Sequence, residues 1–380
     1  MTDHNVSMSN PVVSDAQTRS TGIELLRVIS IILITLHHFS LYSNFQWTPM
    51  TPGLYTVQCL SLGGKVGVSL FIMITGYFMV NKSFSGKKII RLYFQVFFYA
   101  VSLYLIMEAV FLHRIDGADL RYVLMPFSNN IYWFATSYLT LYLLVPFLNR
   151  FIHAMPKKVH FTLICLCVGL WTVWYVISLK NPNYTDFLWL ILLYMIGAYI
   201  RLYPPQRFIK PLVNLFYMLV LFLLACLNLY VLNIGSKQYY LNAAYFYNLD
   251  NFYIFFISLF LFLIFINLRI PNSKLINTVA SASLGVYLIQ ENPWVRPVLW
   301  TYLFRGADFQ ESPYLILYAL GAVLLVFSIS VIIDLIRQKV LENPLMKCIN
   351  TFGPAIAAPF LGIATAIWRK IWIDNTTTTN

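Results

Sequence analysis

Long apolar runs separated by short polar segments fill the chain from about residue 22 onward. A run of about 20 apolar residues is long enough to cross the hydrocarbon core of a membrane as an α-helix. On this basis we expect ten helices, near 23–43, 62–80, 92–112, 131–148, 161–179, 187–203, 211–233, 252–268, 278–295 and 314–336. The pattern therefore predicts an all-α, polytopic membrane protein, a bundle of about ten transmembrane helices.

The composition supports a membrane protein and narrows its partners. Hydrophobic residues make up 59% of the 380 residues and charged residues 11%, which is more apolar material than one soluble core hides. The formal net charge is +12, but the basic residues lie in small clusters between apolar runs. We therefore expect membrane lipids and no nucleic acid among the partners. The five cysteines show no paired spacing, so we expect no metal site and no permanently bound cofactor.

The chain divides into three parts by composition. Residues 1–21 are polar and predict a disordered cytoplasmic tail. Residues 22–340 hold the ten expected helices. Residues 341–380 form a carboxyl-terminal segment, in which 354–368 are apolar with basic residues on both flanks and predict an interfacial or half-spanning helix.

The basic residues predict how the bundle lies in the membrane. The loops on the side of the amino terminus carry most of the lysines and arginines, Lys82, Lys87, Lys88 and Arg91 among them. Because positively charged loops stay in the cytoplasm, we expect a cytoplasmic amino terminus. We also expect a multi-pass protein of the plasma membrane.

Two ionisable residues share one face of the first expected helix. Arg27 and His38 are eleven residues apart, which on an α-helix places them within about 20° of each other and about 16 Å apart along the axis. Ionisable groups inside a membrane usually face the bundle interior or a water-filled cavity. This face therefore indicates a site, although His38 could also be a packing group, and Arg27 could simply pair with Glu24 one turn away.

Several motifs resemble those of one family. Glu24-x-x-Arg27 followed by His38-Phe39 resembles the first helix of the integral-membrane acyltransferase family 3, of the type that O-acetylates surface polysaccharides. Further segments resemble later motifs of that family in the same order, namely 63–78, 88–91, 132–149 and 283–293. The chain departs from the family at Gln290, where relatives often carry His, so a second catalytic His is not expected.

The resemblance implies a donor, a reaction and residues for both. It implies transfer of an acetyl or other short acyl group from acetyl-CoA (acyl-CoA) to a hydroxyl group. His38 is then the candidate base, assisted by Arg27 and Glu24, because a His can accept a proton near neutral pH. Whether His38 carries the acyl group covalently stays open. Lys88 and Arg91 are the candidate ligands of the donor's phosphates.

The implied acceptor is a carbohydrate: a cell-surface or exported polysaccharide, or its lipid-linked precursor. Its candidate ligands are Glu291, Gln290 and Tyr138. We expect a cavity that opens near Lys88 and Arg91, narrows towards Arg27 and His38, and has a second opening near Glu291. The alternatives are a polysaccharide transporter or flippase and a non-catalytic assembly subunit, while the oligomeric state stays undetermined.

Overall fold

The computed structural model describes residues 21–46, 51–111, 116–178, 186–204, 210–235 and 248–351. Within these ranges the regular elements are helices and no strand occurs, which confirms the all-α class. The tail before residue 21 and the expected helix at 354–368 lie outside the described residues.

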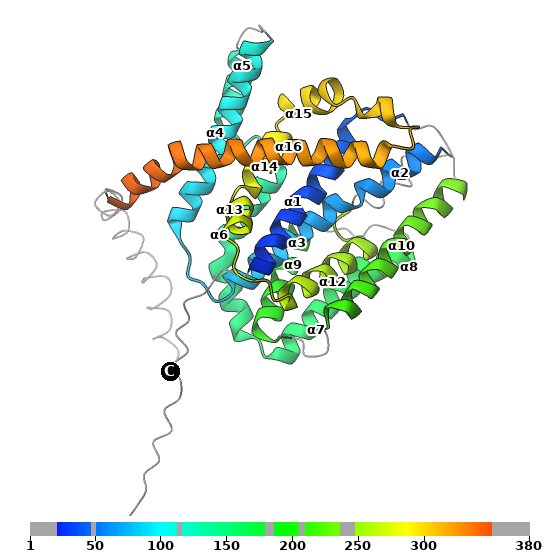
Figure 1. Cartoon of the computed structure of the whole chain (residues 1–380). Coiled ribbons are helices and arrows are strands. Elements are labelled where there is room, and N and C mark those ends of the chain that lie inside the picture. The colour runs from blue at the N-terminus through cyan, green and yellow to red at the C-terminus, as the bar shows by residue number, and fades with distance from the viewer. Residues whose placement is uncertain are drawn as a thin grey trace, which may run out of the picture.

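The described helices follow one another along the whole chain (Figure 1). The first half contains α1 (Thr21–Tyr42), α2 (Pro52–Ser61), α3 (Gly63–Met79), α4 (Gly86–Val110), α5 (Gly117–Leu124), α6 (Trp133–Ala154), α7 (Lys157–Val168), the π-helix η1 (Gly169–Val173) and α8 (Trp174–Ser178). The second half contains α9 (Asp186–Leu202), α10 (Pro211–Gly235), α12 (Phe252–Asn267), α13 (Lys274–Ser281), α14 (Ser283–Gln290), α15 (Val295–Pro297), the π-helix η4 (Val298–Leu303), the 3₁₀-helix η5 (Gly306–Phe309), α16 (Leu315–Arg337) and the π-helix η6 (Gln338–Glu342).

Each of the ten expected helices has a counterpart, but a count of ten membrane spans is not confirmed. Five helical stretches in the described part of the chain are long and apolar enough to cross a membrane. A sixth span results if α6 and the stretch Lys157–Val173 are taken together, although they meet at a bend of 120°. The five are Thr21–Tyr42, Pro52–Met79, Gly86–Val110, Pro211–Ile234 and Leu315–Thr351. The molecule is thus a polytopic membrane protein.

The remaining apolar helices are short, which explains why fewer than ten stretches are long enough to cross a membrane. Helix α12 has 16 residues and α9 has 17, so at 1.5 Å per residue each is about 24–26 Å long, less than the roughly 30 Å of a hydrocarbon core. The stretch expected at 278–295 is divided into two eight-residue helices, α13 and α14. An apolar window in the sequence does not reveal such a break.

Glycines allow the central helices to touch through their backbones. A Cβ atom on Gly76 of α3 would lie 2.1 Å from the carbonyl oxygen of Tyr194 in α9. A Cβ atom on Gly197 of α9 would lie 2.1 Å from the carbonyl oxygen of Met73 in α3. Small residues bring membrane helices close together in this way. Helix α1 also packs on α3, and α1, α3 and α9 form the centre of the bundle, with α16 across α1 and α14 (Figure 1).

Candidate functional site

A cavity of about 500 Å³ lies where the first turns of α1 meet the end of α3, the start of α4 and the end of α16. This is the place at which the sequence predicts a cavity, beside Lys88 and Arg91 and extending to Arg27. Tyr138 of α6 and Tyr287 of α14 also line it. The charged lining residues are Glu24, Arg27, Lys82, Lys88, Arg91, Arg337 and Glu342. Cations outnumber anions on its wall, so the cavity suits an anionic ligand.

Arg27 and Glu24 form a pair on this wall. Arg27 Nη1 lies 3.2 Å from both carboxylate oxygens of Glu24, which is buried. The Arg27 guanidinium also lies 5.6 Å from the ring centre of Phe78. The pairing that the i, i+3 spacing allows is therefore present, and Arg27, with its side chain 29% exposed, still borders the cavity.

The basic residues of α4 and the preceding turn differ in their partners. Lys88 Nζ lies 3.6 Å from the thioether sulfur of Met79, and Lys82 Nζ lies 5.6 Å from the ring centre of Phe78. Among the described residues neither lysine has a carboxylate within ion-pairing distance. Arg91, in contrast, holds the carboxylate of Glu342, with Nε to Oε1 at 2.9 Å. The sequence did not indicate Lys82 as a candidate ligand of the donor. Its place on the cavity wall with Lys88 follows from the fold.

His38 lies beyond the cavity on α1 and contacts Glu291. Its Nε2 atom is 3.4 Å from Oε2 of Glu291, and both side chains are 8% exposed. His38 does not line the cavity itself, but Ile34, one turn earlier, and Tyr287 do. The cavity therefore ends about one helical turn, or roughly 6 Å, before His38.

Two further residues hold the Glu291 carboxylate. Its Oε1 atom accepts hydrogen bonds from the Tyr42 hydroxyl at 3.1 Å and from Arg296 Nη1 at 3.3 Å. Arg296 also donates to the Tyr42 hydroxyl at 3.2 Å. A carboxylate fixed by an arginine and a phenol keeps its place beside His38.

This arrangement distinguishes the two nitrogens of His38. In a neutral imidazole one nitrogen carries the proton and the other accepts. The Glu291 carboxylate beside Nε2 favours the proton on that atom, which leaves the lone pair on Nδ1. Within the described residues Nδ1 is buried without a hydrogen-bond partner. His38 thus has an acid beside Nε2 and no hydrogen-bond partner at Nδ1, an arrangement that suits a base.

The other predicted residues have different surroundings, and Gln290 lies within hydrogen-bonding reach of His38. Gln290 is buried beside α1 and donates to the Thr35 hydroxyl at 3.0 Å. Tyr138 lines the cavity, whereas Glu291 is not among the lining residues. His37 contacts the Ser61 carbonyl oxygen through Nδ1 at 2.7 Å, as a packing residue does.

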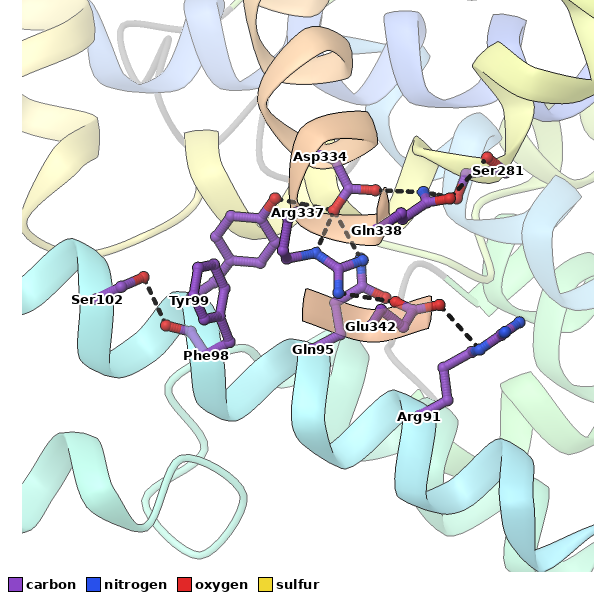
Figure 2. A network of polar contacts seen from close by, with 10 residues as sticks. All are labelled: Arg91, Gln95, Phe98, Tyr99, Ser102, Ser281, Asp334, Arg337, Gln338 and Glu342. Carbon is purple, nitrogen blue, oxygen red and sulfur yellow. Dashed lines mark hydrogen bonds and ion pairs between the residues drawn. The ribbon is translucent and has the colours of Figure 1, made fainter. Parts of the chain in front are cut away.

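The sequence did not predict a polar network that surrounds Asp334 and reaches the cavity wall at Gln95, Arg337 and Gln338 (Figure 2). Asp334 of α16 accepts hydrogen bonds from four side chains, which come from two helices and η6. The donors are Tyr99 at 2.8 Å, Gln95 at 3.2 Å, Arg337 Nε at 2.8 Å and Gln338 at 2.7 Å. The only signal in the sequence is the presence of charged residues at the end of the last apolar run.

Comparison with known proteins identifies a family for most of the chain. The model of an acyltransferase domain, acyltransferase family 3, matches residues 20–334. The match begins next to α1 and ends at Asp334, so it includes His38, Glu291 and most of the cavity wall. No curated protein and no solved structure matches the chain.

Proposed function

The chain belongs to acyltransferase family 3, and from this premise we propose that it is a membrane O-acyltransferase that uses acyl-CoA. The acyl group is an acetyl or similar short group. The acceptor is a hydroxyl of a cell-surface or exported polysaccharide, or of its lipid-linked precursor. The observation that carries the proposal is the His38–Glu291 pair, which lies one helical turn beyond a cation-lined cavity.

The cavity supports an acyl-CoA donor by its charge and size. Coenzyme A carries several phosphates, and these need fixed cations such as Lys82 and Lys88. A volume of about 500 Å³ lies within the range of small-molecule sites, and the walls become apolar towards Ile34 and Phe134. The nucleotide end would lie among the lysines, with the thioester pointing towards His38.

The chemistry requires one base and two proton transfers. His38 Nδ1 takes the proton of the acceptor hydroxyl while that oxygen attacks the thioester carbonyl carbon. The carbon–sulfur bond then breaks, and the leaving thiolate takes the proton from the imidazolium. Glu291 stabilises the imidazolium at Nε2 during this sequence. In the covalent variant His38 Nδ1 attacks the thioester carbon and coenzyme A leaves as the thiolate; the acceptor hydroxyl then attacks the acyl-imidazole, the carbon–nitrogen bond breaks, and the freed Nδ1 takes the hydroxyl proton.

The two sides of the bundle would serve different substrates. The basic loops predict that the cavity with Lys88 faces the cytoplasm, where acyl-CoA is found. His38 lies further along α1, towards the opposite face, and Glu291 at the end of α14 adjoins it. We therefore place the donor on the cytoplasmic side of a plasma membrane and the carbohydrate on the other side.

Sealed vesicles of known orientation test this function. Radiolabelled acetyl-CoA supplied only on the cytoplasmic side should label an acceptor glycan confined to the opposite side. The matched control is the His38→Ala variant in the same vesicles, which should give no label. Labelling that requires both substrates on the cytoplasmic side would contradict the sidedness, and absence of acyl transfer to any glycan fraction would contradict the acceptor class.

A further inference from the structure

One carboxylate on the cavity wall holds two arginines that come from different helices. Glu342 Oε1 lies 2.9 Å from Nε of Arg91 in α4, and Glu342 Oε2 lies 2.7 Å from Nη1 of Arg337 in α16 (Figure 2). All three residues line the cavity. The Glu342 carboxylate is therefore an internal anion that pairs with both Arg91 and Arg337 on the cavity wall.

The guanidinium of Arg337 is not fully satisfied by these contacts. Its side chain is 2% exposed, and its Nε donates to Asp334. Within the described residues, Nη1 pairs with Glu342 Oε2 at 2.7 Å, whereas Nη2 is buried without a hydrogen-bond partner. A buried guanidinium has five N–H groups and is costly to leave without acceptors. Arg337 thus retains donors for a ligand with more oxygens than one carboxylate.

Glu342 has a less regular position than the other acid of the network. Asp334 lies within α16 and accepts four hydrogen bonds. Glu342 ends the π-helix η6, and its polar contacts within the described part of the chain are with the two arginines. Short π-helical turns often occur at functional sites. A rearrangement that moves Glu342 therefore breaks two ion pairs and leaves the Asp334 cluster in place.

We propose that Arg91 and Arg337 form a binding site for a phosphate group of the donor, and that Glu342 occupies this site when it is empty. Two guanidinium groups match the oxygens of one phosphate better than a single carboxylate does. Donor binding then exchanges the Glu342 carboxylate for a phosphate. Glu342 lowers the affinity for the donor nucleotide and favours release of coenzyme A after transfer.

The assignment of this ligand as the acyl-CoA donor rests on the proposed function. The existence of an anion-binding site does not depend on that function. The released carboxylate remains in a cavity that Lys82 and Lys88 also line, which limits the cost of the exchange. A ligand with a single carboxylate gains little, because it only replaces one carboxylate by another. The site therefore selects phosphate esters.

Binding of coenzyme A and of inorganic pyrophosphate to the purified full chain tests the proposal by calorimetry in detergent. Glu342→Gln keeps the shape of the side chain and removes its charge, so it should tighten binding of both probes by about tenfold. Asp308→Asn is the matched control, since Asp308 pairs with Arg305 at 2.8 Å outside the cavity and should leave binding unchanged. Adding Arg91→Gln to Glu342→Gln should remove most of the gain.

The outcomes separate the anion site from the donor assignment. Unchanged or weaker binding of pyrophosphate to Glu342→Gln overturns the anion site, whatever the enzyme acylates. Tighter pyrophosphate binding without a change for coenzyme A retains the anion site and overturns its assignment to the donor. If Glu342→Gln fails to fold, the Arg91→Gln variant provides the test. It should weaken pyrophosphate binding, and unchanged binding would refute the site.

Discussion

His38 Nε2 and Glu291 Oε2 lie 3.4 Å apart, although His38 belongs to α1 and Glu291 follows α14, about 250 residues later in the chain. Tyr42 and Arg296 hold the other oxygen of the carboxylate. The sequence indicated Glu291 as an acceptor ligand, whereas the structure places it against His38, the candidate base. This relationship determines the first two predictions.

Replacement of His38 by Ala should abolish acyl transfer. The loss of a general base lowers the rate of a reaction by about 10²–10⁴-fold. If His38 carries the acyl group covalently, its loss should lower the rate at least as much. Acyl transfer by purified enzyme in lipid vesicles measures the effect, with coenzyme A binding as a check on the fold. His37→Ala is the control and should lose far less activity. Activity that survives in His38→Ala but not in His37→Ala would show the assignment to be wrong.

Replacement of Glu291 by Gln should lower kcat by about 10²–10⁴ with a small effect on the KM for acyl-CoA. Gln keeps the size of the side chain but no longer stabilises the imidazolium at Nε2. Steady-state kinetics with acyl-CoA at a saturating acceptor concentration measure both constants. An increase in the KM for the acceptor at constant kcat would instead support the role in acceptor binding that the sequence indicates.

Replacement of Lys88 by Gln should raise the KM for acyl-CoA more than it lowers kcat, because a phosphate contact is made equally in the ground and transition states. Lys82→Gln should change both constants in the same direction. The affinity should also fall with salt in the wild type, and less steeply in these variants. Equal acyl-CoA binding by the wild type and the Lys82→Gln/Lys88→Gln double variant would exclude the lysines from the donor site.

Replacement of Gly76 by Ala should destabilise the protein by about 1–3 kcal/mol, because the new methyl group meets the backbone of α9. Gly321→Ala in α16 is the matched control, since a Cβ atom there has no neighbour within 4 Å. Thermal unfolding in detergent compares the two variants. Equal melting temperatures would mean that the contact between α3 and α9 is looser than the structure indicates.

The sequence predicted those features that depend on local helix geometry. Each of the ten apolar runs expected to span the membrane has a helical counterpart, because the cost of exposing backbone in lipid forces such runs into helices. The i, i+3 spacing allowed the Glu24–Arg27 pair that the structure contains. The family motifs also located the chain's family correctly, since these motifs are local stretches of sequence.

Other features required contacts between helices far apart in the chain. The number of spans depends on where an apolar run is divided into separate helices, as between α13 and α14. Both sides of this break are apolar, so the sequence pattern does not reveal it. The basic pair Lys88 and Arg91 looked equivalent in sequence, yet only Arg91 has Glu342 as a partner among the described residues.

The sequence by itself thus determined which stretches are helical, the family and the face of α1 that carries Arg27 and His38. Only the tertiary structure decided that Glu291 adjoins His38 and that the cavity ends one turn before this pair. The physical reason is that helical periodicity fixes which residues share a face of one helix. Which faces of two helices meet depends instead on side-chain volumes and on close approaches such as that at Gly76, which no local pattern specifies.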